Sequence, residues 1–305
     1  MRFGVFTMQL GPADALIARW HRAEEVGFDS IWVADHTTTQ YPELVHFEAW
    51  TLLAAMARET DRVRVGTMVT QIAFRHPALL AMEVATVDHL SGGRVELGIG
   101  AGGAPLDAAY VGVEAWSKRE RLDRLAEQVD ILDRMLRGET VTSDARYPTT
   151  AARVIQAVQR PRPPIVIAAQ GPTAMRVVAR YADTWNTLGG QPMGAAPPIP
   201  LADALAETRR QIEALDSACR AVGRDPATVR RSVCLYKSLV LLQSIDSFEE
   251  VCSGYAALGF DEIVIYWPFL SPRAYPTEEI VRSSEAVLVR AMAEVVPRLR
   301  GGPGS

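Results

Sequence analysis

Short apolar segments alternate with amphipathic ones along nearly the whole chain, and this alternation limits the folds open to it. Eight segments read as strands, at residues 2–7, 30–34, 63–69, 95–99, 165–169, 184–188, 229–242 and 262–266. Between them, apolar residues recur at helical spacing, with Gly or Pro at several segment ends. Because the strands are continuously apolar, they are typical of a parallel sheet covered by helices. We therefore predict an α/β fold, a single (βα)8 (TIM) barrel domain over residues 1–300 with a frayed tail at 301–305.

Two segments depart from the repeat. Residues 138–164 are irregular and Pro-rich, and we expect an excursion there, after the helix that follows the fourth strand. Residues 189–200 are rich in Gly, Pro and Ala and predict a loop after the sixth strand. A doubly wound open sheet is the alternative fold. The barrel is favoured because no GxGxxG opens the first helix with an acidic residue after the next strand.

Charge and cysteine content limit the partners and the compartment. The net charge is −4 and no basic stripe is present, which disfavours nucleic acid and anionic membranes as partners. The sequence contains no apolar stretch long enough to span a membrane, and we expect no signal peptide because the first residues read directly as a strand. The three cysteines, Cys219, Cys234 and Cys252, form no metal-binding spacing. We expect a cytoplasmic protein with reduced thiols, no metal and a small-molecule substrate.

The active site of a (βα)8 barrel lies at the carboxyl ends of its strands, so the residues there are the candidates for chemistry. Those after the first six strands include Met8, Asp35, His36, Met68, Val69, Thr70, Ala101, Gly102, Gly103, Ala169, Gln170, Gly171, Pro172, Thr173 and Asn186. His36 can give or take a proton near neutral pH, which suits a general acid or base. A histidine held by a backbone partner is the alternative interpretation.

Two glycine-containing segments could approach a ligand. Residues 98–103 admit either a close contact between backbone and a planar ligand or simply a tight turn. The tripeptide Gly171-Pro172-Thr173 begins a predicted helix, whose free N–H groups and positive dipole end can hold a phosphate. Proline is common in a first helical turn without any ligand, so this signal is weak by itself. Trp116 lies near a loop and could line a pocket.

Other enzyme classes on the same barrel fit the sequence less well. A metal-dependent hydrolase needs several convergent His and carboxylate ligands, commonly His-x-His on the first strand. The first strand here contains neither histidine nor carboxylate. A Ser or Cys nucleophile elbow is also missing from the sequence.

Five runs together resemble the luciferase-like monooxygenase superfamily, most strongly over residues 1–190. They are EVGFDSIWVADH (25–36), RVGTMV (64–69), RHP (75–77), SGGRVELGIG (91–100) and RYADTWN (180–186). The resemblance implies a (βα)8 barrel that binds FMN or the deazaflavin coenzyme F420 with its ring at the mouth of the barrel.

The resemblance also implies roles for individual residues. A bulge with a non-proline cis peptide at Met68-Val69, next to Thr70, would support the ring, and Asp35 and His36 would lie near its reactive face. Ala101, Gly102 and Gly103 would flank the ring or its ribityl chain. The phosphate would be held by Ala168, Ala169, Gln170, Gly171, Pro172 and Thr173, and the substrate pocket would include Met8, Trp116 and Asn186.

Residues 47–53 and 181–186 look like those of actinobacterial deazaflavin enzymes, which favours coenzyme F420 over FMN. The expected function is hydride transfer between F420 and a small organic substrate. Two alternatives stay open, an FMN-dependent monooxygenase using reduced flavin and O2, and a non-catalytic flavin-binding protein. Gly103 stands where deazaflavin-dependent sugar-phosphate dehydrogenases look acidic, which speaks against a sugar phosphate. The resemblance also implies a homodimer.

Overall fold

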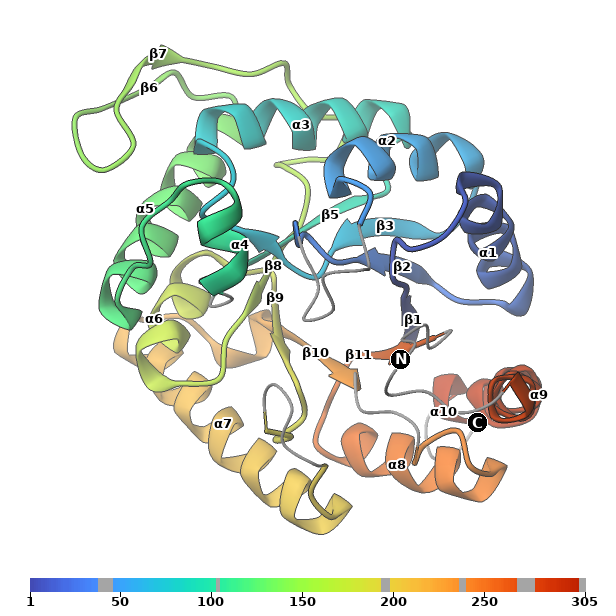
Figure 1. Ribbon diagram of the computed structural model, residues 1–305. Coiled ribbons are helices and arrows are strands. Elements are labelled where there is room, and N and C mark those ends of the chain that lie inside the picture. The colour runs from blue at the N-terminus through green and yellow to red at the C-terminus, as the bar shows by residue number, and fades with distance from the viewer. Residues whose placement is uncertain (38–45, 103–104, 193–197, 236–239, 268–277, 302–305) are drawn as a thin grey trace.

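The computed structural model describes residues 1–37, 46–102, 105–192, 198–235, 240–267 and 278–301. Within them, one parallel sheet closes on itself, because β3 pairs with β2 on one side and with β5 on the other (Figure 1). Its strands are β1 (Arg2–Phe6), β2 (Ser30–Val33), β3 (Arg64–Thr67), β4 (Thr70–Gln71), β5 (Val95–Gly100), β8 (Ile165–Ala168), β9 (Thr184–Thr187), β10 (Arg230–Leu235) and β11 (Glu262–Tyr266). Strands β3 and β4 both pair with β5 and together occupy one strand position of the barrel. The closed barrel therefore has the predicted eight strand positions.

A ring of helices covers the outside of this barrel (Figure 1). The helices are α1 (Ala13–Val26), α2 (Ala49–Glu59), α3 (Pro77–Leu90), α4 (Pro105–Tyr110), α5 (Lys118–Leu136), α6 (Pro172–Tyr181), α7 (Leu201–Ala221), α8 (Ile245–Ala257), α9 (Glu278–Glu294) and α10 (Val296–Gly301), with a short 3-10 turn, η1, at Pro226–Thr228. The predicted (βα)8 barrel is therefore confirmed. None of the described helices combines the length and apolarity needed to cross a membrane.

Two glycines allow β3 and β5 to come close together. A Cβ atom on Gly98 would lie 1.8 Å from the carbonyl oxygen of Thr67, and one on Gly66 would lie 2.4 Å from the carbonyl oxygen of Glu96. Both distances are far below any tolerable contact, so only glycine fits. Strand packing therefore explains Gly66 and Gly98 without a ligand.

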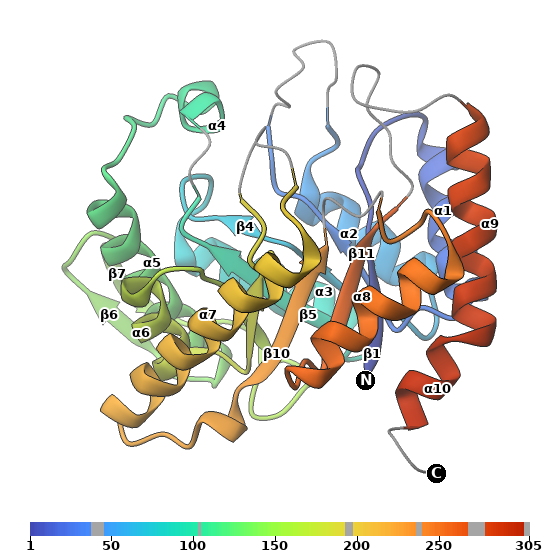
Figure 2. The ribbon, with the colours of Figure 1, turned by 90° about the horizontal axis from the view of Figure 1, so that it is seen from below.

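The interior of the barrel is filled in two layers. At the end where the strands begin, Arg2 donates hydrogen bonds to Glu96 at 2.8 Å and to Glu262 at 2.7 Å. Above this polar layer lies an apolar cluster that includes Phe6 and Trp32. Because the interior is filled, we expect the active site at the open end, where the strands finish. Figure 2 shows α4 on that side and both termini on the opposite side.

The structure corrects the sequence predictions at three places. The seventh strand, expected at 229–242, is the shorter β10, and residues 240–242 form a turn; residues 236–239 lie outside the described residues. The sequence pattern predicts one closing helix over residues 278–299, but the structure divides it into α9 and α10, because Pro297 cannot continue the hydrogen bonding of α9. The excursion at 138–164 contains an antiparallel hairpin of β6 (Val141–Ser143) and β7 (Thr149–Ala152). The tail at 302–305 and residues 193–197 of the predicted loop also lie outside the described residues.

Candidate active site at the barrel mouth

Apolar side chains form the floor of the mouth. Met8, Met68, Leu188 and Tyr266 pack on the apolar cluster inside the barrel, and the two methionines are half-buried. The expected non-proline cis peptide is present between Met68 and Val69, where the third strand position is interrupted. The floor therefore brings together Met8 and Met68, two of the residues predicted for the site.

His36 lies three residues after the end of β2 and is bound to a carboxylate. Its Nδ1 lies 2.5 Å from Oδ2 of Asp107 on α4, whereas 42% of the His36 side chain is exposed. Asp107 itself is 3% exposed. A histidine whose Nδ1 donates to a buried carboxylate keeps its other ring nitrogen, Nε2, available to a ligand.

Further hydrogen bonds fix the Asp107 carboxylate. The backbone N–H and the hydroxyl of Thr37 each donate to its Oδ1 at 2.9 Å, and the amide of Gln71 donates to its Oδ2 at 3.3 Å. Burial opposes ionisation of this carboxyl. The bonds from His36 and Thr37 outweigh burial and hold its pKa below the ordinary value. Asp107 is therefore a charged acceptor at neutral pH.

Asp35, the neighbour of His36, contacts a different set of residues. Its carboxylate is 3% exposed, accepts from the backbone N–H of Gln71 at 3.0 Å and pairs with Arg75 at 2.6 Å. Burial raises the pKa of Asp35 in spite of the Arg75 charge. Arg75 also binds Glu48, which caps α2, and approaches Glu83 on α3. Asp35 thus ties the end of β2 to β4 and to the start of α3, and so holds His36 in place.

A small cavity of about 50 Å³ adjoins the His36–Asp107 pair. Its lining includes Gln71, Ala101, Gly102, Asp107 and Trp116. The guanidinium of Arg124 stacks on the Trp116 ring, 4.2 Å from its centroid, which fixes the ring in the wall. The structure therefore brings together three residues that the sequence placed at the mouth, Ala101, Gly102 and Trp116.

The glycine-proline turn after β8 opens α6, as expected. Gly171 is the N-cap and makes no side-chain cap, and Pro172 is the first residue of the helix. A Cβ atom on Gly171 would meet nothing within 4 Å, and its φ of −110° is open to any residue. The protein's own packing therefore does not require glycine here. Ala168, Gln170 and Gly171 are half-buried, Ala169 is buried, and Pro172 and Thr173 are exposed.

Three predicted site residues lie elsewhere or outside the described residues. The Thr70 hydroxyl is buried between Thr67 at 2.7 Å and the indole N–H of Trp50 at 3.3 Å, so it is directed away from the mouth. The side chain of Asn186 is buried inside the barrel and donates to Ser232 at 3.1 Å. Gly103 lies in the part of the chain that is not described. No group of three His, Cys, Asp or Glu side chains among the described residues is placed to hold a metal ion.

Sequence reasoning missed Asp107 and Arg75. Arg75 lies four residues after the end of β4, so its place in the chain could have pointed to it. Asp107 lies seven residues beyond the end of β5 on a six-residue helix, and it is far from any strand end in the sequence. Only the structure shows that it meets His36.

Known proteins share both sequence and fold with this chain. An F420-dependent glucose-6-phosphate dehydrogenase of Microbacterium testaceum is 35% identical over 195 residues, 63% of this chain and 57% of the relative. An F420-dependent hydroxymycolic acid dehydrogenase of Mycobacterium tuberculosis is 31% identical, over 73% of this chain and 58% of the relative. This chain spans about half the length of the curated relatives it matches.

Solved structures agree on the fold over nearly the whole chain. The coenzyme F420 dependent tetrahydromethanopterin reductase of Methanopyrus kandleri has a TM-score of 0.72 at 16% identity, covering 97% of this chain and 98% of that one. This likeness supports the barrel alone. The family model described as luciferase-like monooxygenase matches residues 1–243, well over half of the sequence. The chain therefore belongs to the luciferase-like monooxygenase family.

Proposed function

We propose that this protein is an oxidoreductase that transfers a hydride between coenzyme F420 and a small organic substrate. The observation that carries the proposal is a histidine anchored by a buried carboxylate at the mouth of the barrel, His36 on Asp107. Among the curated relatives, F420-dependent dehydrogenases match at 31% to 37% identity, which supports F420 as the coenzyme.

The mouth has the features that a deazaflavin with a phosphate tail requires. Met8 and Met68 offer an apolar surface for the ring. The turn at Gly171 and Pro172 offers an uncapped helix start and open space in front of it for the phosphate. The residues present therefore fit the coenzyme, and the segments 101–102 and 168–173 are the ones we assign to holding it.

His36 is the group we assign to proton transfer. When bound, coenzyme F420 supplies a ring carbon that accepts or returns a hydride. Oxidation of an alcohol to a carbonyl compound also releases the hydroxyl proton, which Nε2 of His36 takes up. Asp107 accepts the hydrogen bond from Nδ1, and its negative charge stabilises the imidazolium that results. In the reverse direction, His36 returns the proton to the substrate oxygen.

A second candidate is an FMN-dependent monooxygenase. A 4-hydroxyprotoasukamycin monooxygenase of Streptomyces nodosus subsp. asukaensis is 31% identical over 195 residues, 59% of this chain and 50% of the relative. Both cofactors have a planar ring and a phosphate, so the same mouth could hold either. The two candidates differ in the cofactor that binds and in whether O2 is consumed.

A binding experiment distinguishes the candidates without knowledge of the substrate. The purified protein is titrated with oxidised F420 and, separately, with FMN, and the quenching of cofactor fluorescence is followed. We expect micromolar or tighter binding of F420 and binding of FMN at least about tenfold weaker. Preferred binding of FMN would replace the first candidate by the second, and binding of neither would contradict both.

The proposal also includes that the protein forms a homodimer and is located in the cytoplasm. The three cysteines are buried and free of disulfides, as in proteins of reducing compartments.

A further inference from the structure

We infer that a groove on the outside of the barrel, between α6 and α7, holds the anionic tail of the coenzyme beyond its phosphate. The inference rests on the proposed function, because it takes F420 as the ligand. The groove has a volume of about 940 Å³. Its lining includes Pro172, Arg176 and Arg180 from α6 and Arg224 from the segment after α7, and α7 contributes mainly small side chains such as Ala214 and Ala218.

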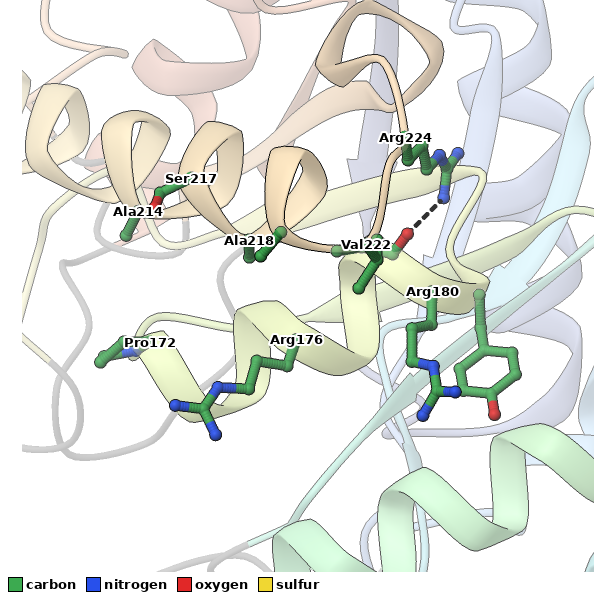
Figure 3. A pocket seen from close by; sticks show the side chains of 11 residues that line it. Pro172, Arg176, Arg180, Ala214, Ser217, Ala218, Val222 and Arg224 are labelled. Carbon is green, nitrogen blue, oxygen red and sulfur yellow. Dashed lines mark hydrogen bonds between the residues drawn. The ribbon is translucent and has the colours of Figure 1, made fainter.

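The groove begins where the phosphate is proposed to bind. Pro172 belongs both to the helix start and to the groove. Figure 3 shows Pro172 at one end, Arg224 near the other, and Arg176 and Arg180 on the same side of α6 between them. At a rise of 1.5 Å per helical residue, Arg176 and Arg180 lie about 6 Å and 12 Å along α6 from Pro172. A chain leaving the phosphate therefore passes one arginine per helical turn.

The charge of the groove is unusual for this protein. The chain has a net charge of −4, yet the described residues that line the groove include three arginines and no carboxylate. In the described part of the chain, none of the three guanidinium groups forms an ion pair with a carboxylate. Arg180 lies over the Tyr181 ring at 5.9 Å, and Arg224 donates to the carbonyl oxygen of Ala179 at 3.2 Å and to Thr228.

The chemistry of the coenzyme matches this arrangement. Beyond its phosphate, F420 continues into a lactyl group and a chain of glutamates, each of which adds a carboxylate. Guanidinium groups are well suited to carboxylates because they can donate two parallel hydrogen bonds. The small residues of α7 leave room for an extended chain. FMN ends at its phosphate, so the groove would also favour F420 over FMN.

The test compares two forms of the coenzyme, F420 with five or more glutamates and the same deazaflavin phosphate without any glutamate. Their dissociation constants are measured by fluorescence quenching at low and at high salt. The wild-type protein should bind the glutamate-bearing form about threefold to tenfold more tightly at low salt, because exposed ion pairs contribute modestly and are screened. The preference should shrink as salt rises.

The double variant Arg176→Ala/Arg180→Ala should lose this preference and bind the glutamate-free form as the parent does. The matched control is Arg209→Ala/Arg220→Ala, which removes two exposed arginines of α7 outside the groove and should keep the preference.

Equal affinity of the wild type for both forms, or an unchanged preference in the groove variant, would overturn the inference and leave the proposed function intact. If the wild type binds neither form, both proposals are wrong. A groove variant with a smaller assembly in light scattering would instead identify the groove as a contact between copies of this chain.

Discussion

The Nδ1 atom of His36 lies 2.5 Å from the Oδ2 atom of Asp107, and this contact joins two segments that are 71 residues apart. It connects the end of β2 with α4, a short helix that follows β5 on the mouth side of the barrel (Figure 2). The imidazole of His36 is partly exposed, whereas the Asp107 carboxylate is buried. In the proposed function, His36 therefore faces the ligand, and Asp107 orients the imidazole ring and balances its charge.

The first prediction concerns this carboxylate. Asp107→Asn keeps the size of the side chain but removes its charge, so we expect turnover to fall by at least about tenfold with the fold intact. Asp144→Asn, in the exposed β6–β7 turn, is the control. Parental turnover in Asp107→Asn would show that Asp107 has only a structural role.

The second prediction concerns the phosphate site. Gly171→Asp places a negative charge at the start of α6, so cofactor affinity should fall by at least about tenfold through like-charge repulsion. Gly171→Ala adds only a methyl group, which meets no protein atom within 4 Å, and thus separates the effect of charge from that of size. Both variants should unfold at the parental temperature. If Gly171→Asp bound the cofactor as tightly as the parent, the phosphate would have to lie elsewhere.

The third prediction concerns stability and pH. Burial raises the pKa of Glu83 to about 7, helped by Glu48 and Asp35 and only partly opposed by Arg75. The folded state therefore binds the Glu83 proton more tightly than the unfolded state, in which the pKa of this carboxyl is 4.5. The stabilisation of the folded state by this proton is complete below pH 4.5 and is lost as the pH rises to about 7.

Glu83→Gln removes this titration. The melting temperature of the variant should fall less than that of the parent between about pH 5 and about pH 8. The control is Glu25→Gln, whose carboxylate is largely exposed on α1. Parallel pH dependence in parent and Glu83→Gln would count against the raised pKa.

The fourth prediction concerns assembly. A homodimer should scatter light with twice the 33.4 kDa mass of the chain at micromolar concentration. A species of the single-chain mass alone would argue for a monomer.

The alternation of strands and helices could be predicted because it depends on local patterns. The predicted helix at residues 77–90 and the predicted strand at 262–266 agree with α3 and β11 at both ends, since proline, glycine and charged residues mark those ends. The division of the closing helix was also readable, because Pro297 stands inside the predicted segment, near its C-terminal end. The hairpin of β6 and β7 was missed, although β-branched residues lie on both sides of its turn.

The candidate site could be predicted only in part. The strand-end rule and the family resemblance placed Met68, Ala101 and Gly171 at the mouth, where the structure has them. Asp107 could not be found in this way, because its role depends on a contact with a distant segment. The directions of Thr70 and Asn186 could not be found either. A strand end fixes where a residue lies, and packing decides which way its side chain points.

The most direct test of the proposed function is the His36→Ala variant in a coupled assay. A working substrate is first found by screening alcohols and carbonyl compounds for a change in the visible absorbance of F420 with the wild-type protein. The variant should then lower kcat by at least about tenfold, while the dissociation constant of F420 changes much less. Equal kcat in variant and parent, or turnover that requires FMN and O2 instead of F420, would contradict the assignment of His36 and F420 to this reaction.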